Sequence, residues 1–353
     1  MPIHDVGYRN WSGPLTSAMT RWWTISEAGI RTALKSRWIR RAMLASWLPV
    51  IYFGVCFFLF EKMMDPNLAN MAQRHGVPGV TEGMEILEEQ GGADILNQAE
   101  REMDRRAFEQ LPLLESIPNQ EALATAFESE DERVIRNTAW NWLLSTFLRY
   151  PQGMMTLLII GLIVPPLISR DVRSRAFLLY YSRPITRLEY LIGKLAIPGA
   201  VLALITMVPA MALYFFGVML SPNMSVVFDT WDIPIRIVVA TAVAVVPTCL
   251  IALLFSSLTQ ESRYAGFAWF TVWGLGAVVW FIIYFSNSGG GQLPFDSNWS
   301  LISLYSTIGR VQAWVFGLEP EFSSVLPSMI VLALITVLSA LWLNRRVSAP
   351  VRN

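Results

Sequence analysis

Six long apolar segments constrain this chain more than any other feature of its sequence. Each contains roughly 20 mostly apolar residues, the length that an α-helix needs to cross the hydrocarbon core of a bilayer. Hydrophobic residues make up 54% of the chain and charged residues only 15%, so a soluble protein would lack the polar residues to cover its surface. We therefore predict an all-α polytopic membrane protein. The predicted transmembrane helices are 42–60, 152–169, 191–220, 234–256, 264–286 and 325–343.

The charged residues are segregated, although the formal net charge is zero. Residues 1–41, the basic stretch 170–194, the loop 257–263 and the tail 344–353 together carry 17 Lys and Arg but only 5 Asp and Glu. The rest of the chain carries 10 basic and 22 acidic residues. Lys and Arg are retained on the cytoplasmic side of a membrane. We therefore predict that both termini are cytoplasmic.

Two long segments fall on the predicted outer side. Residues 61–150 carry 17 acidic and 8 basic residues, with apolar residues at helical spacing, and we predict a helical extracytoplasmic domain. Its last helix is expected to run from about residue 119 through Trp140 toward the second span. This domain either stiffens the outer side as an acidic cap or binds a substrate or partner. Residues 287–324 predict an outer loop with amphipathic or re-entrant helices.

The predicted cytoplasmic N-terminus, residues 1–41, contains an amphipathic segment at 15–40. Trp22 and Trp23 share one helical face with other apolar residues, and basic residues occupy the opposite face. This pattern is typical of a helix that lies in the membrane interface, with both tryptophans as anchors. A plain extension of the first span is the alternative interpretation.

Several chemical functions lack their sequence signals. The predicted spans hold few charges, whereas proton- or sodium-driven transporters need buried acids. His4, His75, Cys56 and Cys249 do not have metal-ligand spacing. Neither a G-x-x-x-x-G-K-[ST] phosphate-binding loop nor a G-x-S-x-G motif is present. We therefore predict no catalytic residue, metal site or cofactor on this chain, and no nucleic-acid partner. Energy for uphill transport would have to come from another subunit.

The stretch "LISRDVRSRAFLLYYSRPITRLEYLIGKL" at 167–195 joins two predicted spans. Residues 169–183 are predicted to be helical, and Pro184 ends that helix because proline disfavours helical geometry in the residue before it. Thr186-Arg187-Leu188-Glu189 predicts a capping box that starts the next helix. This stretch could instead be a basic loop on anionic lipid heads. Its ordered arginines and aromatics favour a protein partner, since Arg, Tyr and Phe concentrate at such interfaces.

This stretch resembles the cytoplasmic segment of bacterial ABC-2-type permeases, the membrane subunits of ABC transporters. That family also has an interfacial elbow helix before the first of six transmembrane helices and a broken outer helix pair before the last, and each has a counterpart here. The extracytoplasmic insert after the first span is longer than in minimal members. The matching positions are Arg170-Asp171, Leu178-Leu179-Tyr180, Ser182-Arg183-Pro184, Tyr190 and Gly193-Lys194-Leu195.

The resemblance implies a permease subunit, expected to be an exporter, in the bacterial inner membrane. Residues 170–190 would be the coupling helix, which fits a cleft in a separate cytoplasmic ATPase subunit that binds the ATP. A second permease subunit, identical or related, would complete the complex within the lipid bilayer. The residues expected to contact the ATPase are Arg170, Asp171, Arg173, Arg175, Phe177, Tyr181, Arg183 and Arg187.

Two other classes of function stay open at this point. One is a non-transporting scaffold or sensor with the acidic outer domain as its receptor. The other is a membrane-embedded enzyme, which would need outward-facing acids to converge on one pocket. The candidate acids for that enzyme are Asp229, Asp232 and Asp296.

Overall fold

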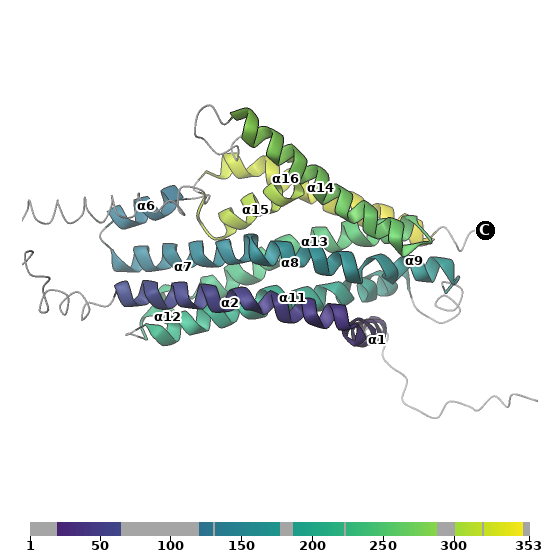
Figure 1. The fold of residues 1–353 in the computed structure, drawn as a ribbon, viewed down its shortest axis with the longest axis horizontal. Helices are drawn as coiled ribbons and strands as arrows, with labels where there is room; N and C mark the ends of the chain where they lie inside the picture. The colour runs from purple at the N-terminus through teal and green to yellow at the C-terminus, as the bar shows by residue number, and fades with distance from the viewer. Residues whose placement is uncertain are drawn as a thin grey trace, which may run out of the picture.

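The computed structural model describes residues 20–64, 120–129, 131–176, 186–221, 224–287, 301–319 and 321–348. These residues form α-helices and their connections, with no strand among them. Figure 1 shows most of the long helices lying roughly along one common axis. The helices are α1 (Arg21–Lys35), α2 (Arg37–Met63), α6 (Gln120–Glu128), α7 (Glu132–Arg149), α8 (Pro151–Ile163), α9 (Pro165–Arg173), α11 (Arg187–Leu220), α12 (Val226–Asp229), α13 (Ile233–Leu258), α14 (Ser262–Asn287), α15 (Leu304–Val315) and α16 (Phe322–Ser348).

Five helical stretches in the described part of the chain are long and apolar enough to cross a membrane. Each contains one predicted span. The sixth predicted span, 264–286, coincides with α14, which is not among the five, so a crossing by α14 stays a prediction. The five stretches are Arg37–Lys62, Glu132–Arg173, Arg187–Leu220, Ile233–Leu258 and Phe322–Val347.

The second stretch is longer than its predicted span, because α7, α8 and α9 follow one another end to end (Figure 1). Tyr150 and Val164 join them in helical conformation. Pro151 and Pro165 each occupy the first position of their helix, and each lacks the N–H that would continue the hydrogen bonds of the helix before it. The helix expected from about residue 119 is divided into α6, which ends at Glu128, and α7, which Asp131 caps by accepting a hydrogen bond from Arg133 N. One rod therefore extends from Glu132 to Arg173.

The interior of the bundle has two groups of packed apolar side chains. One lies among α8, α9, α11, α13 and α16 and includes Ile160, Leu202 and Leu253, all fully buried. The other joins α2, α7 and α11, where Trp140 packs edge-on against Phe57 and Tyr214. Because α7 contributes fully buried side chains to this second group, the residues just before the predicted second span belong to the helical bundle.

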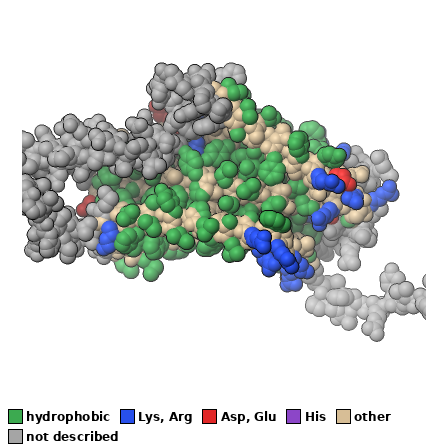
Figure 2. All heavy atoms as spheres, viewed as in Figure 1, with side chains coloured by type: hydrophobic (Ala, Val, Ile, Leu, Met, Phe, Trp, Pro, Cys, Tyr) green, Lys and Arg blue, Asp and Glu red, His purple; other side chains and the backbone are tan. Residues whose placement is uncertain are grey.

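The outer surface matches a membrane environment. Figure 2 shows hydrophobic side chains covering the middle of the visible face, whereas Lys and Arg gather at the end that carries α1 and α9. Large apolar side chains are exposed on α2 and α16, including Leu48, Ile51, Leu338 and Trp342. Exposed apolar surface on this scale marks contact with lipid or with another protein.

Helix α1 lies across the end of α2 and is seen nearly along its axis in Figure 1. Ser36 separates the two helices with an extended backbone, φ −67° and ψ 125°. Trp23 is 52% exposed, whereas Trp22 is partly buried. The other side of α1 packs on α11, where Ser26 donates a hydrogen bond to Gly193 O. The interfacial position of Trp22 and Trp23 stays a prediction.

Candidate functional site

The end of α9 is the first part of the candidate site. The sequence predicted a helix over 169–183, but α9 ends at Arg173. Ala176 N donates to Asp171 O at 3.0 Å and Arg175 N to Val172 O at 3.3 Å, the two bonds of a Schellman motif. Arg175 holds the left-handed position of this motif with φ 51°, where glycine is usual. The predicted single helix is therefore wrong, because a C-cap motif ends α9 at Arg173, which is also the end of the rod.

The start of α11 is the second part, and here the predicted capping box is confirmed. Thr186 Oγ1 accepts a hydrogen bond from Glu189 N, and Glu189 Oε2 accepts one from Thr186 N at 2.6 Å. The helix therefore begins at Arg187, as the predicted capping box requires, and the predicted transmembrane span 191–220 lies within it. Phe177, Tyr181 and Arg183 lie in the connection between α9 and α11, outside the described residues.

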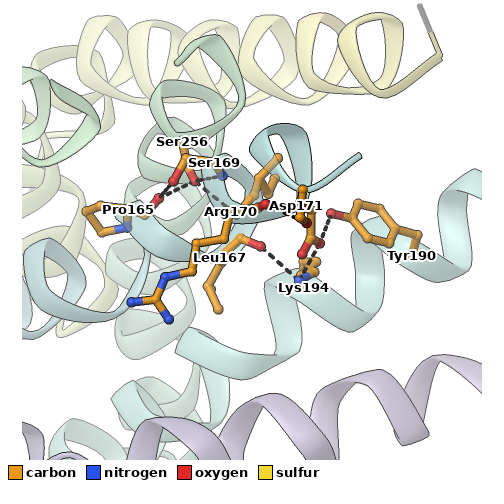
Figure 3. Close-up of polar contacts among 10 residues, drawn as sticks. Pro165, Leu167, Ser169, Arg170, Asp171, Tyr190, Lys194 and Ser256 are labelled. Atoms are coloured by element: carbon orange, nitrogen blue, oxygen red, sulfur yellow. Dashed lines mark hydrogen bonds and ion pairs between the residues drawn. The ribbon is translucent and has the colours of Figure 1, made fainter. Parts of the chain in front are cut away.

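A buried ion pair joins these two helices (Figure 3). Asp171 Oδ2 accepts hydrogen bonds from Tyr190 Oη and Lys194 Nζ, each at 2.7 Å. Lys194 also donates to Leu167 O at 2.8 Å and lies 5.5 Å from the centroid of the Tyr190 ring. Tyr190 is fully buried and the Lys194 side chain is 9% exposed. We call Asp171, Tyr190 and Lys194 the Asp171 cluster, which fastens the end of α9 to the first turns of α11.

A serine on α13, Ser256, holds the first turn of α9 through hydrogen bonds. Ser256 is fully buried; its Oγ accepts hydrogen bonds from Ile168 N and Ser169 N and donates to Pro165 O at 2.6 Å (Figure 3). Pro165 O also accepts from Ser169 Oγ. The kink that Pro165 introduces exposes backbone groups that a straight helix would pair internally. Ser256 satisfies them, so α9 is tied to α13 as well as to α11.

Gly193, which precedes Lys194 on α11, lies at a close contact with α1. A Cβ at this position would lie 3.0 Å from both Ile25 Cβ and Trp22 O. The glycine thus allows the backbone of α1 to approach α11 closely. Within the Gly193-Lys194 pair, one residue therefore seats α1 and the next pairs with α9.

The predicted contact residues divide into two groups. Arg170, Arg173, Arg175 and Arg187 are exposed around the Asp171 cluster, and Arg173 forms an ion pair at 3.2 Å with Glu261, in the connection from α13 to α14. The Asp171 carboxylate differs, since its side chain is 14% exposed and engaged inside the bundle. The exposed arginines thus form a basic surface, and the Asp171 cluster beneath it holds the ends of α9 and α11 together.

Residues 153–347, more than half of the chain, match the model of the ABC-2 family transporter proteins. The chain belongs to this family. The curated proteins and the solved structures yield no match. The matched range runs from α8 through α16, so it contains the Asp171 cluster and Ser256. As a member of the ABC-2 family, the chain is a permease in the membrane, and the resemblance drawn from the stretch 167–195 is confirmed.

Three residues of this ABC-2 site were not among the predicted contact residues, namely Tyr190, Lys194 and Ser256. A signal existed for two of them: Tyr190 and Lys194 are four residues apart on a predicted helix and so share a face. Their shared partner, Asp171, lies on another helix, which sequence spacing does not reveal. Ser256 carried no signal, because a lone serine near a helix end is common.

Two of the acids proposed for a membrane-embedded enzyme, Asp229 and Asp232, are held in ion pairs at the end of the bundle opposite α9 (Figure 1). Asp232 pairs with Arg236 at 2.7 Å, and Asp229 lies 3.8 Å from Arg133. Arg236 also donates to Val315 O, at the end of α15. Asp296 lies outside the described residues. Asp229 and Asp232 thus connect α7, α12, α13 and α15, a structural arrangement.

Proposed function

We propose that this permease is the membrane subunit of an ABC exporter whose ATPase is a separate cytoplasmic protein. The ATPase would dock on the exposed arginines of 170–190, a second permease subunit would complete the complex, and both termini would be cytoplasmic in a bacterial inner membrane. One observation carries the proposal: the basic surface is fastened by the Asp171 cluster to α11 and by Ser256 to α13. A lipid-binding loop has no need of such fixation.

The fixation gives a route for mechanical coupling. Force applied to the end of α9 would pass along the rod from Arg173 to Glu132, which reaches the opposite end of the bundle (Figure 1). Because Lys194 and Ser256 anchor α9 to two further long helices, those helices would move with it. Packed helices behave as bistable units, so a small displacement at one end can change the arrangement at the other.

Charge reversal at Arg170 tests the docking surface. Arg170 is exposed and lies next to the Asp171 cluster without belonging to it. The change Arg170→Glu should abolish co-purification of the ATPase in mild detergent, because a cation in a protein interface would become an anion. Arg346→Glu is the matched control, since Arg346 is also exposed on the predicted cytoplasmic side but belongs to α16.

The result also separates the alternatives. Full co-purification with Arg170→Glu, together with unchanged transport, would refute docking on this surface. If the variant loses binding to anionic vesicles but keeps the ATPase, the lipid interpretation is correct. If the unmodified chain captures no ATPase from its own cells, a non-transporting scaffold or sensor becomes the better description.

A further inference from the structure

A small cavity with a mostly apolar wall lies inside the bundle, where α7 meets α8. Its volume is about 30 Å³, whereas roughly 10–15 Å³ suffices for one water molecule. It can therefore hold a small chemical group but not a whole organic molecule. The described residues that line it come from α7, α8, α11, α13, α14 and α15 and include Arg149, Thr156, Thr206, Thr241, Thr248 and Gln312.

Most of the cavity wall is apolar, and a few polar side chains reach it. Arg149 is 6% exposed, and its guanidinium lies against the backbone of Gly309, where an added Cβ would be 2.7 Å from Cζ. The Thr241 side chain is 5% exposed, and its Oγ1 has no hydrogen-bond partner among the described residues. The buried indole N–H of Trp273 likewise has none there. No Asp or Glu is among the described residues that line the cavity.

Other polar groups of the same wall are already engaged. Thr206 Oγ1 donates to Leu202 O and Thr248 Oγ1 to Ala244 O, each within its own helix. Gln312 Nε2 donates to Ala240 O at 3.1 Å. Leaving a buried polar group without a partner costs roughly 1–3 kcal/mol. The Thr241 hydroxyl and the Trp273 N–H are therefore groups that a bound acceptor would satisfy, beside a guanidinium suited to oxyanions.

We propose that this cavity binds the carboxylate or phosphate end of an amphiphilic substrate. The inference rests on the proposed transport function and names the chemical class that it would carry. The positive charge and the donors select an oxyanion, and the volume admits only the charged end. Leu148, Gly153, Ala244, Tyr305 and Ile308 are also part of the wall. An apolar remainder of the substrate would continue between the helices. A charged residue inside a helical bundle in the membrane commonly marks such a pathway.

Binding of decyl phosphate to the purified permease tests the proposal. The chain is held in dodecyl maltoside, an uncharged detergent, and labelled decyl phosphate is followed by equilibrium dialysis. Thr241→Val should weaken binding about tenfold, because it removes one donor to a charged group. Thr206→Val is the matched control: it makes the same change in the same cavity, but its hydroxyl is committed to Leu202 O. Its affinity should stay within about twofold of the unmodified chain.

Further variants and probes complete the test. Arg149→Gln should weaken binding by about a hundredfold. If Arg149→Gln misfolds, Trp273→Phe takes its place and should weaken binding measurably. Decanol should bind far more weakly than decyl phosphate, and inorganic phosphate should displace the probe poorly. The proposal is overturned if Thr241→Val and Thr206→Val behave alike, if decanol binds equally well, or if inorganic phosphate competes at equal concentration.

These measurements use the permease alone, so they are independent of ATPase docking. Loss of the ATPase with intact decyl phosphate binding would remove the proposed coupling but leave the cavity assignment. Absence of binding in a chain that still captures the ATPase would remove the cavity assignment alone.

Discussion

Two buried carboxylates, one near each end of the bundle, are held by the same chemistry. At the end that carries α9, Asp171 accepts from Tyr190 and Lys194. At the other end, Glu61 of α2 accepts from Trp140 Nε1 at 2.9 Å and pairs with Arg136 at 3.4 Å, both on α7. We call Glu61, Arg136 and Trp140 the Glu61 cluster. Each cluster joins two helices through one carboxylate, one aromatic donor and one cation.

The two clusters differ in how completely their polar atoms are satisfied. Lys194 makes an additional hydrogen bond to Leu167 O, and the bonds to Asp171 are short. In the Glu61 cluster, the contact of Arg136 Nε with Glu61 Oε1 at 3.4 Å is an ion pair without a hydrogen bond. Glu61 Oε2 has no hydrogen-bond partner among the described residues, although the Glu61 side chain is only 2% exposed. The α9 end is therefore held by short hydrogen bonds whose partners are satisfied, whereas the α2–α7 contact depends mainly on burial.

Removing the carboxylate of the Glu61 cluster should have the largest effect. In Glu61→Leu, the Arg136 guanidinium is left buried, with its side chain only 11% exposed. The free energy of unfolding should fall by about 3–5 kcal/mol, measured by unfolding in mixed micelles of increasing SDS content. The double variant Glu61→Leu/Arg136→Leu should recover most of the loss. If the single variant is as stable as the unmodified chain, burial does not make this pair critical.

Removing the cation of the Asp171 cluster should cost less. In Lys194→Met, the carboxylate keeps its bond to Tyr190 and some access to water, since it is 14% exposed. We expect a loss of about 2 kcal/mol, below the range for fully buried pairs. The ATPase should still co-purify while transport falls. The control is Asp171→Asn/Lys194→Met, which removes both charges. If Lys194→Met loses more unfolding free energy than Glu61→Leu, the ranking of the two clusters is reversed.

The sequence predicts the helices of this molecule far better than the contacts between them. Apolar runs and the Thr186–Glu189 spacing are local signals, so the long helices and the start of α11 follow from them. The end of α9 did not follow, because a Schellman motif with arginine at the left-handed position has no glycine to announce it. The continuity of α7 with α8 and α9 agrees with the helix predicted to run through Trp140 toward the second span, whereas the break between α6 and α7 was not predicted.

The buried ion pairs were missed for a related reason. Lys194 was counted among the retained basic residues and among the positions of the family resemblance, and Glu61 among the outer acids, but neither residue was given a partner. Their partners are 23 and 75 residues away in sequence, and no periodicity connects such positions. Arg149 likewise became a candidate for substrate binding only when α15 and α13 were seen beside it.

Removing the aromatic hydrogen-bond donor of each cluster tests whether Tyr190 and Trp140 contribute equally to the free energy of unfolding. Tyr190→Phe deletes the hydrogen bond to Asp171 but leaves the ion pair with Lys194, so the loss should be about 1–2 kcal/mol. Trp140→Phe deletes the matching bond to Glu61 and also removes packing against Phe57 and Tyr214, so its loss should be larger. Both are measured by the same SDS unfolding. Equal losses would mean that packing of the Trp140 ring contributes little.

The smallest expected effect concerns the backbone that leads away from the Asp171 cluster. Arg175 has φ 51°, a conformation that costs a non-glycine residue on the order of 1 kcal/mol. Arg175→Gly should therefore stabilise the chain by about 1 kcal/mol, whereas Arg175→Ala removes the same side chain and keeps the strain. The difference in unfolding free energy between the two variants isolates the backbone term from the charge. If they are equally stable, α9 is ended by the side chains of the Asp171 cluster rather than by its C-cap, and the α9 end resembles the Glu61 end more closely than the hydrogen bonds suggest.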